Sequence, residues 1–325
     1  MHPTPRRRSR TGGTDQRKVL GLRVAVTGAT GVIGTSVVPD LIHAGHDVVG
    51  LARTAEKASL LENVGASAYR STLHDHDALV EMFEGADAVC NFATRIPVGY
   101  SALRRGAWRV NDRLRTDGVR RVLDAAREAG VRRVVQESVS FLYADQGDEW
   151  ITEDAPLEIT RATEPACVGE SHVQDYTCGS RTGVVLRFGT IVGDDPLTRF
   201  RLRALRHGQP VGLGSPSGWA HVVHTDDLGP AVLAALTAPS GVYNVGAAPV
   251  RRFEMVAGFA AVAGRESIDF MGPLLRRVGG ARLEPLARSL RVSSDLLTAS
   301  TGWTPHRAKF DSTWFEALRP GEHVR

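Results

Sequence analysis

The sequence predicts an α/β fold, a Rossmann-type doubly wound parallel sheet with a smaller carboxyl-terminal substrate region. An apolar run, LRVAVTG at 22–28, ends in glycine as a buried parallel strand does. Further apolar runs then alternate with helical patterns through the first half of the chain. The chain has 325 residues, 42% of them hydrophobic, which is enough for one large core and a smaller appended region.

The expected elements follow one another along the core. The first strand leads into a helical pattern that Gly45 closes, and the second strand is 47–53. The later elements are a helix at 54–63, strand 67–70, helix 76–84, strand 86–93, helix 108–129, strand 132–138, helix 166–180 and strand 183–193. Such helical crossovers are what parallel strands require. We place a dinucleotide-binding core at 21–190 and a substrate-binding region, interleaved with the core, at 191–325.

The first 20 residues are polar, rich in arginine and without hydrophobic periodicity, which predicts a disordered basic arm. A solvated tail is favoured over a nucleic-acid or membrane-binding arm, because a short basic run is a weak motif for either partner. No apolar segment follows the arginines as an export signal requires, and no run approaches the length of a membrane span. The three cysteines match no metal spacing. We expect a cytoplasmic protein with no bound metal and no nucleic-acid or membrane partner.

The segment GATGVIG at 28–34 lies between the first strand and the first helix. Glycines suit this place because the turn is tight and a pyrophosphate must approach the main chain closely. The amino terminus of the helix then offers free N–H groups to the phosphates. The strand, turn and helix occur in the order that a dinucleotide site needs. The predicted cofactor-binding residues of this loop are Gly28, Thr30, Gly31, Val32, Ile33 and Gly34.

The end of the second strand indicates which dinucleotide binds. An NAD site usually has an acidic residue here for the ribose 2′-hydroxyl. This strand ends instead with Arg53, whose guanidinium suits a bidentate contact with a 2′-phosphate, and Lys57 lies nearby in the sequence. NADP is therefore favoured over NAD, the alternative being an arginine that is merely solvated.

Nearly the whole chain after residue 20, this loop included, resembles the extended short-chain dehydrogenase/reductase superfamily, including its NAD-dependent epimerase/dehydratase group. The similar segments are TGATGVIG, GADAVCNFAT, VVLRFGTIVGDD, HVVHTDDLGPAVLAAL, GVYNVG and TGWTP. The resemblance implies a small-molecule substrate and a homodimer formed through the helices at 108–129 and 166–180. Phe188 stands where the family usually has proline. The resemblance extends the cofactor site to Leu73, Ala93, Thr94, Phe188, Thr190 and Ile191.

The redox members of this family use a serine and a Tyr-x-x-x-Lys pair on one helix face. The lysine lowers the pKa of the tyrosine, which transfers a proton while hydride moves at the nicotinamide. In this chain none of the three lysines has a tyrosine four positions before it. Alignment on Tyr143 places Val139 at the serine position, and Tyr176 is followed four residues later by Ser180. The sequence therefore lacks the family's proton relay.

Three residues remain as candidate substitutes for catalysis. Ser138 and Tyr143 lie near the end of the fifth strand, and His172 lies on the helix that replaces the Tyr-Lys helix, as does Glu170. Each has a structural alternative, because the serine can satisfy backbone groups, the tyrosine can brace a loop and the histidine can be a surface residue. The group His221, His224, Asp226 and Asp227 lacks reliable metal-ligand spacing.

These observations predict an NADP-dependent oxidoreductase with an atypical active site that acts on a small carbonyl or alcohol metabolite. Hydride transfer belongs to the cofactor, so it survives loss of the relay if another donor or water supplies the proton. Two alternatives stay open. One is a non-redox enzyme of the same fold, a lyase, isomerase or cyclase, and the other is a catalytically inactive NADP-binding regulator.

Overall fold

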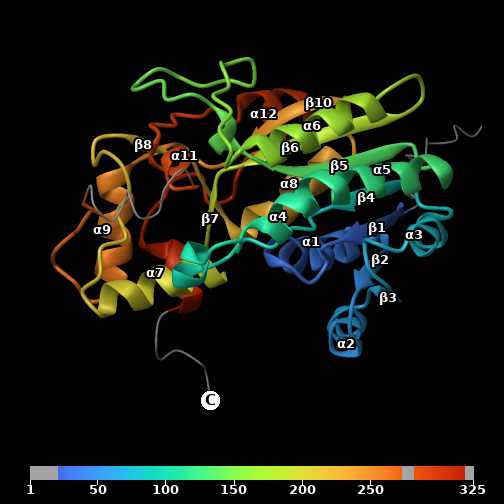
Figure 1. The fold of residues 1–325 in the computed structure, drawn as a ribbon, viewed down its shortest axis with the longest axis horizontal. Coiled ribbons are helices and arrows are strands. Elements are labelled where there is room, and N and C mark those ends of the chain that lie inside the picture. The colour runs from blue at the N-terminus through green and yellow to red at the C-terminus, as the bar shows by residue number, and fades with distance from the viewer. Residues whose placement is uncertain (1–20, 273–281, 319–325) are drawn as a thin grey trace, which may run out of the picture.

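The computed structural model describes residues 21–272 and 282–318, so the predicted basic arm at 1–20 lies outside it (Figure 1). A seven-stranded sheet in the order β10-β6-β5-β4-β1-β2-β3 forms its centre, and neighbouring strands pair in parallel. The Rossmann-type α/β prediction is confirmed. The strands of this sheet are β1 Arg23–Thr27, β2 Asp47–Ala52, β3 Ser67–Arg70, β4 Ala88–Asn91, β5 Arg133–Val139, β6 Thr182–Phe188 and β10 Gly241–Val245.

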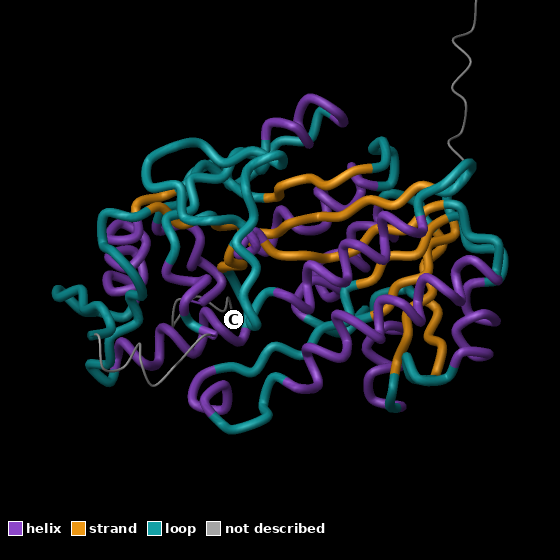
Figure 2. The backbone as a smooth tube through the Cα atoms, turned by 45° about the horizontal axis from the view of Figure 1, so that its top comes forward, coloured by secondary structure: helices purple, strands orange, loops and turns teal. Residues whose placement is uncertain are grey.

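Two hydrophobic clusters cover the two faces of the sheet, with helices packed on each (Figure 2). Successive strand residues alternate between them: Val134 and Val185 belong to one cluster, and Val135 and Val184 belong to the other. Helices α3, α5 and α6 supply one face, and α1, α2, α8 and α12 supply the other. These helices are α1 Val32–His43, α2 Ala55–Asn63, α3 His76–Phe83, α5 Val119–Glu128, α6 Glu164–Tyr176, α8 Leu228–Ala235 and α12 Asp295–Thr301.

The helix predicted at 108–129 contains a π-helical turn. It consists of α4 Arg109–Arg113, the turn η2 Leu114–Gly118 and then α5. Wide turns of this kind often occur at functional positions in helices. Here the turn carries Arg115, whose charged side chain is buried at the end of β5.

The carboxyl-terminal region builds a second, smaller layer around its own apolar cluster. It contains two pairs of short strands. Strands β7 Thr190–Val192 and β9 Val222–His224 are parallel, and strands β8 Trp219–Ala220 and β11 Val250–Arg251 are antiparallel. Among the described residues, the helices packed around this cluster include α7 Pro196–Arg206, α9 Arg252–Val262 and α11 Glu284–Ala287. The 3₁₀ turns in the described part of the chain are η1 Gly99–Leu103, η3 Ser140–Leu142, η4 Thr225–Asp227 and η6 Ser312–Leu318.

The single strand expected at 183–193 was wrong, because the chain divides at Gly189 into β6 and β7. A Cβ at this glycine would lie 2.8 Å from the backbone carbonyl group of His221. That close approach lets the chain leave the main sheet and pair with β9. Strand β10, from the predicted substrate region, returns to the main sheet beside β6.

Among residues 21–272 and 282–318, no helix combines the length and the apolar composition needed to cross a bilayer.

Candidate functional site

The loop between β1 and α1 has the geometry of a phosphate cradle. Gly28 has a φ of +70°, and a Cβ there would lie 2.5 Å from the backbone of Phe92. A Cβ at Gly34 would lie 2.4 Å from the carbonyl oxygen of Gly28. Gly31 is the N-cap of α1 and provides no side-chain cap, so the first N–H groups of the helix stay free for a ligand. Only glycine fits the two close approaches, which is the local reason for this sequence.

Arg53 follows the last residue of β2 and is exposed. Its side chain has no hydrogen bond or ion pair with any residue that the structure describes. Thr54 next to it caps α2 by accepting a hydrogen bond from the backbone N–H of Lys57 at 3.3 Å. The guanidinium is therefore positioned on a fixed turn with its donors uncommitted.

The other predicted cofactor residues lie along the carboxyl ends of the strands. Ala93 and Thr94 come directly after Phe92, which touches Gly28, and both are half-buried. Phe188 ends β6 and is buried, and Thr190 and Ile191 are half-buried in β7. Leu73, which follows β3, is buried in the cluster on the α3 face, and Thr30, Val32 and Ile33 belong to the loop and first turn of α1.

A ladder of buried polar side chains runs across the strand ends next to the cradle. The hydroxyl of Thr27 donates to Asn91 Oδ1 at 2.5 Å, and Asn91 Nδ2 donates to Gln136 Oε1 at 2.8 Å. These residues come from β1, β4 and β5, which are neighbours in the sheet. Because buried polar groups are costly without partners, the ladder holds the three strand ends in register.

Ser138 leads into a buried ion pair at the ends of β5 and β6. Its hydroxyl donates to Glu170 Oε1 at 2.5 Å, and Arg187 contacts the same carboxylate through Nε at 2.9 Å and Nη2 at 2.6 Å. All three side chains are at most 5% exposed. Burial lowers the pKa of Arg187, but the hydrogen bonds that Arg187 donates to Glu170 and the charge of that carboxylate raise it further, so the net pKa is above its already high ordinary value and the guanidinium stays charged. The serine proton is thereby directed to a carboxylate within the protein.

Tyr143 is fully buried beside this pair. Its hydroxyl donates to Asn244 Oδ1 at 2.8 Å, and the Arg187 guanidinium lies 4.9 Å from the ring centroid. Burial raises the pKa of Tyr143, because it disfavours the phenolate. The phenol proton is thus committed to Asn244, a geometry that suits bracing of the loop after β5.

A second buried pair joins the π-helical turn to β5. Arg115 Nη2 donates to Glu137 Oε1 at 2.6 Å. Burial raises the pKa of Glu137 and the nearby guanidinium opposes that shift. Glu137 Oε2, Arg187 Nη1 and the Ser140 hydroxyl are buried and have no hydrogen-bond partner among the described residues.

Helix α6 is the element that the family resemblance assigns to the Tyr-Lys pair. Ala166 and Glu170 lie on its buried face four residues apart, which is the spacing of a Tyr-x-x-x-Lys pair. Their side chains are a methyl group and a carboxylate, in place of a phenol and an ammonium group. His172 is half-buried two residues later and makes no side-chain hydrogen bond with the described residues. The structure therefore joins Ser138 and Tyr143 through Arg187 and does not bring His172 to them.

Sequence reasoning missed the two arginines of this cluster. The available signal was a charged residue inside an apolar strand, Arg187 in VVLRF, since a buried arginine requires a carboxylate partner. The candidate metal group is engaged elsewhere: His224 contacts the carbonyl of Trp314, and the Asp227 carboxylate accepts the N–H groups of residues 306 and 307. No cluster suited to a metal occurs in the described part of the chain.

Comparison with known proteins fits this geometry. Residues 24–246 match the NAD dependent epimerase/dehydratase family. The chain belongs to this family. The resemblance seen in the sequence is therefore confirmed, and so is the central sheet that the family shares.

The similar proteins differ in how much of the chain they match. The 3-diazoavenalumate denitrifying reductase of a Streptomyces species is 29% identical over 303 residues, 87% of this chain and 96% of the relative. An uncharacterized protein of Schizosaccharomyces pombe is 43% identical over 72 residues, and that match spans only 22% of this chain and 24% of the relative. The Streptomyces venezuelae dTDP-glucose 4,6-dehydratase DesIV, solved with NAD, has a TM-score of 0.73 at 19% identity, covering 90% of this chain and 94% of that chain.

Proposed function

We propose that this protein is an NADP-dependent reductase that transfers hydride to a small electrophilic metabolite. The observation that carries the proposal is the glycine cradle at the start of α1, in which Gly28 and Gly34 leave no room for a Cβ. Bound dinucleotide phosphates fit such a cradle, because the free N–H groups and the helix dipole favour anions. When bound, the nicotinamide supplies the hydride.

Arg53 supports NADP as the dinucleotide. Its uncommitted guanidinium follows β2, where an acidic residue would favour NAD. The structural neighbour DesIV was solved with NAD, so the fold alone does not favour the phosphorylated form. The preference for NADP therefore depends on this side chain and on Lys57 one turn later.

The closed cluster around Glu170 supports a reductase that works without the family's proton relay. Ser138 gives its proton to Glu170, and Tyr143 gives its proton to Asn244, so neither offers a free donor. Where the substrate is a carbonyl compound, water supplies the proton after hydride transfer. The Streptomyces relative is itself named a reductase, which favours redox chemistry over a lyase or isomerase. Three free cysteines fit the reducing cytoplasm as the place of action.

Titration of the purified protein with NADPH and NADH by calorimetry tests the cofactor. NADPH oxidation with a panel of aldehydes, ketones and other electrophiles, followed by absorbance, tests the reaction. The proposal expects tighter binding of NADPH than of NADH, and turnover with at least one electrophile. If neither dinucleotide binds, the proposal is wrong.

The same closed cluster also favours the second candidate, an NADP-binding protein without hydride transfer. Such a protein needs no proton relay, so a buried ion pair at that position does not impair its function. Tight NADPH binding with no oxidation across the whole panel would support this candidate over the reductase. A change of substrate without net change in NADPH would instead identify a non-redox enzyme.

A further inference from the structure

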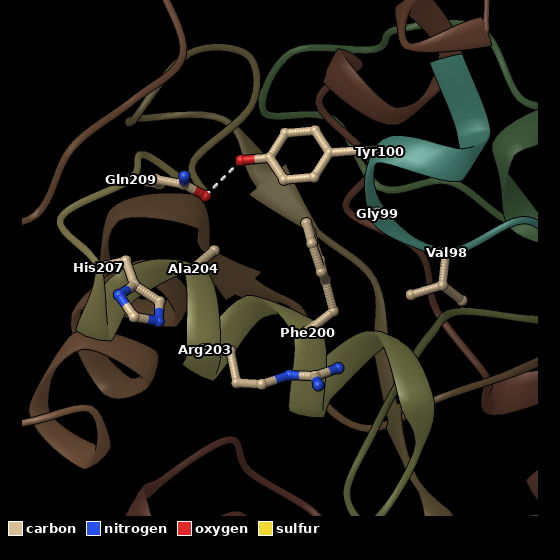
Figure 3. Close-up of a pocket in the computed structure, with 8 residues that line it drawn as sticks. All are labelled: Val98, Gly99, Tyr100, Phe200, Arg203, Ala204, His207 and Gln209. Carbon is tan, nitrogen blue, oxygen red and sulfur yellow. Dashed lines mark hydrogen bonds between the residues drawn. The ribbon is translucent and has the colours of Figure 1, made fainter. Parts of the chain in front are cut away.

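A pocket of about 410 Å³ lies between the dinucleotide-binding core and the carboxyl-terminal region (Figure 3). One wall is the segment Val98–Tyr100, in the loop that follows β4. The other wall is a stripe made of Phe200 and Arg203 of α7 and of His207, the residue directly after that helix, which recur at helical spacing. The opposite side of α7 carries Leu202 and packs into the apolar cluster of the carboxyl-terminal region. The pocket stripe is therefore free of any packing role in that cluster.

The loop is held firmly against the helix. Tyr100 donates its hydroxyl proton to Gln209 Oε1 at 2.6 Å, and its ring meets Phe200 edge to face at 5.9 Å between centroids. Gly99 has a φ of +64°, and a Cβ there would lie 2.5 Å from the Phe200 ring. Figure 3 shows Tyr100 reaching toward Gln209, with the Phe200 ring beneath it. These contacts give the pocket a defined aromatic wall.

The charge of the pocket is positive and uncompensated. The side chains of Arg203 and His207 are exposed and have no hydrogen bond or ion pair with the residues that the structure describes. Arg199, on the same helix, is instead paired with Asp194. The pocket lining contains no aspartate or glutamate. An anion on a ligand would therefore find a free guanidinium fork and no acidic side chain in the lining.

We propose that this pocket binds the anionic end of the substrate, and that the substrate is an aromatic or conjugated carboxylate. The Arg203 guanidinium pairs with the carboxylate, the imidazole of His207 adds a hydrogen bond, and the rings of Phe200 and Tyr100 pack against the conjugated body. This assignment rests on the proposed function, since it treats the ligand as the molecule to be reduced.

The segment that lines the pocket follows closely in the chain on the residue that borders the cofactor cradle. The pocket segment begins at Val98, and Phe92, which touches Gly28, precedes it by six residues. Six residues span at most about 20 Å even when fully extended. The stretch of chain that borders the cradle at Phe92 therefore also lines the pocket from Val98 onward.

Binding of trans-cinnamate and of its uncharged amide, measured by calorimetry with and without NADPH, tests the inference. The two probes share size and ring, and the amide replaces one charged carboxylate oxygen by a neutral NH₂ group at the end that Arg203 would hold. We expect cinnamate to bind about tenfold more tightly than cinnamamide, as for a hydrogen-bonded charge pair. Arg203→Gln should remove that preference. Arg206→Gln is the matched control, because Arg206 is an exposed arginine of α7 outside the pocket lining.

Equal affinity of the wild-type protein for the two probes, or absence of binding, would overturn the inference. So would equal loss of the preference in the Arg203 and Arg206 variants, since that result would indicate general attraction to a basic helix. Affinity for NADPH should be the same in both variants. A wild-type protein that prefers cinnamate and fails to bind NADPH would reject the proposed function and keep the carboxylate pocket.

Discussion

The carboxyl edge of the sheet has two halves, and their polar groups differ in whether they have partners. The half at β1 and β2 leaves polar groups open, and the half at β5 and β6 pairs them. After β1 the first backbone N–H groups of α1 have no side-chain cap, and after β2 the exposed guanidinium of Arg53 has no partner among the residues that the structure describes. At β5 and β6, Ser138, Glu170 and Arg187 bind one another and are almost fully buried. One half is open to a ligand and the other is closed on itself. The chain therefore keeps an open glycine loop at one end of this edge, and an internal ion pair of Glu170 and Arg187 occupies the other.

The largest effect is expected from a variant that disrupts the buried cluster at β5 and β6. Glu170→Gln leaves Arg187 as a buried charge with a weakened partner, which should lower the free energy of unfolding by about 3–5 kcal/mol. Urea denaturation measures the loss. The double variant Glu170→Leu with Arg187→Met should recover most of the stability, because it removes both charges together.

A surface ion pair provides the control for this prediction. Asp124→Asn weakens the surface contacts of Asp124 with Arg120, at 3.4 Å, and with Arg127, at 2.9 Å, and should cost less than about 1 kcal/mol. If Glu170→Gln costs no more than Asp124→Asn, the buried pair does not stabilise the fold. In that case the closed half would have to be explained by catalysis.

The open half should respond to Gly28→Ala through ligand binding. The new Cβ meets the Phe92 backbone and must displace the loop that forms the cradle, so we expect NADPH affinity to fall by about 100-fold. The positive φ adds about 1–2 kcal/mol of strain to the folded protein whether or not NADPH is bound. Gly45→Ala is matched to it, since Gly45 has a φ of +87° with nothing within 4 Å of a Cβ. That control should lose stability and keep NADPH affinity. Calorimetry that finds equal affinity for the two variants would contradict the cradle.

His221 lies outside both halves and is buried without hydrogen-bond partners among the described residues. A variant at this position tests whether such burial lowers the stability of the fold. Both ring nitrogens lack hydrogen bonds with the described residues, and burial lowers the pKa of His221 to about 3. Between about pH 3 and pH 6.5 the unfolded chain binds a proton that the folded chain excludes, so stability falls as pH falls through this range.

Relative to His221→Leu, the wild-type protein should therefore lose about 2 kcal/mol between about pH 8 and pH 5. Urea denaturation at several pH values measures the difference between the two proteins. His74→Leu, at an exposed site, should leave the pH dependence unchanged. A His221→Leu curve parallel to the wild-type curve would show that the ring is hydrated in the folded protein.

The smallest effect is expected at Arg53, in the open half at β1 and β2. Arg53→Gln should weaken NADPH binding by about tenfold and leave NADH binding unchanged, because only NADPH carries the 2′-phosphate. Arg132→Gln, an exposed arginine at the opposite end of the strands, is the control. Parallel losses for NADPH and NADH would show that Arg53 does not read the 2′-phosphate.

The sequence by itself determined the features that depend on neighbours along the chain. The cradle at 28–34, the arginine after the second strand and the missing Tyr-x-x-x-Lys pair are all readable within a few residues. The strand–helix alternation likewise fixed the parallel sheet, since parallel strands need helical crossovers. The division at Gly189 escaped this reasoning, because the residue that requires it, His221, is distant in the chain.

Only the tertiary structure decided which side chains meet. Tyr143 and Asn244 are 101 positions apart, and Tyr100 and Gln209 are 109 apart, so no local pattern could pair them. Glu170 finds Arg187 because α6 packs beside β5 and β6, and the strand order sets that placement. Contacts of this kind depend on strand order and register, which are settled by the whole core at once. The closed relay position and the pocket at α7 are consequences of that packing.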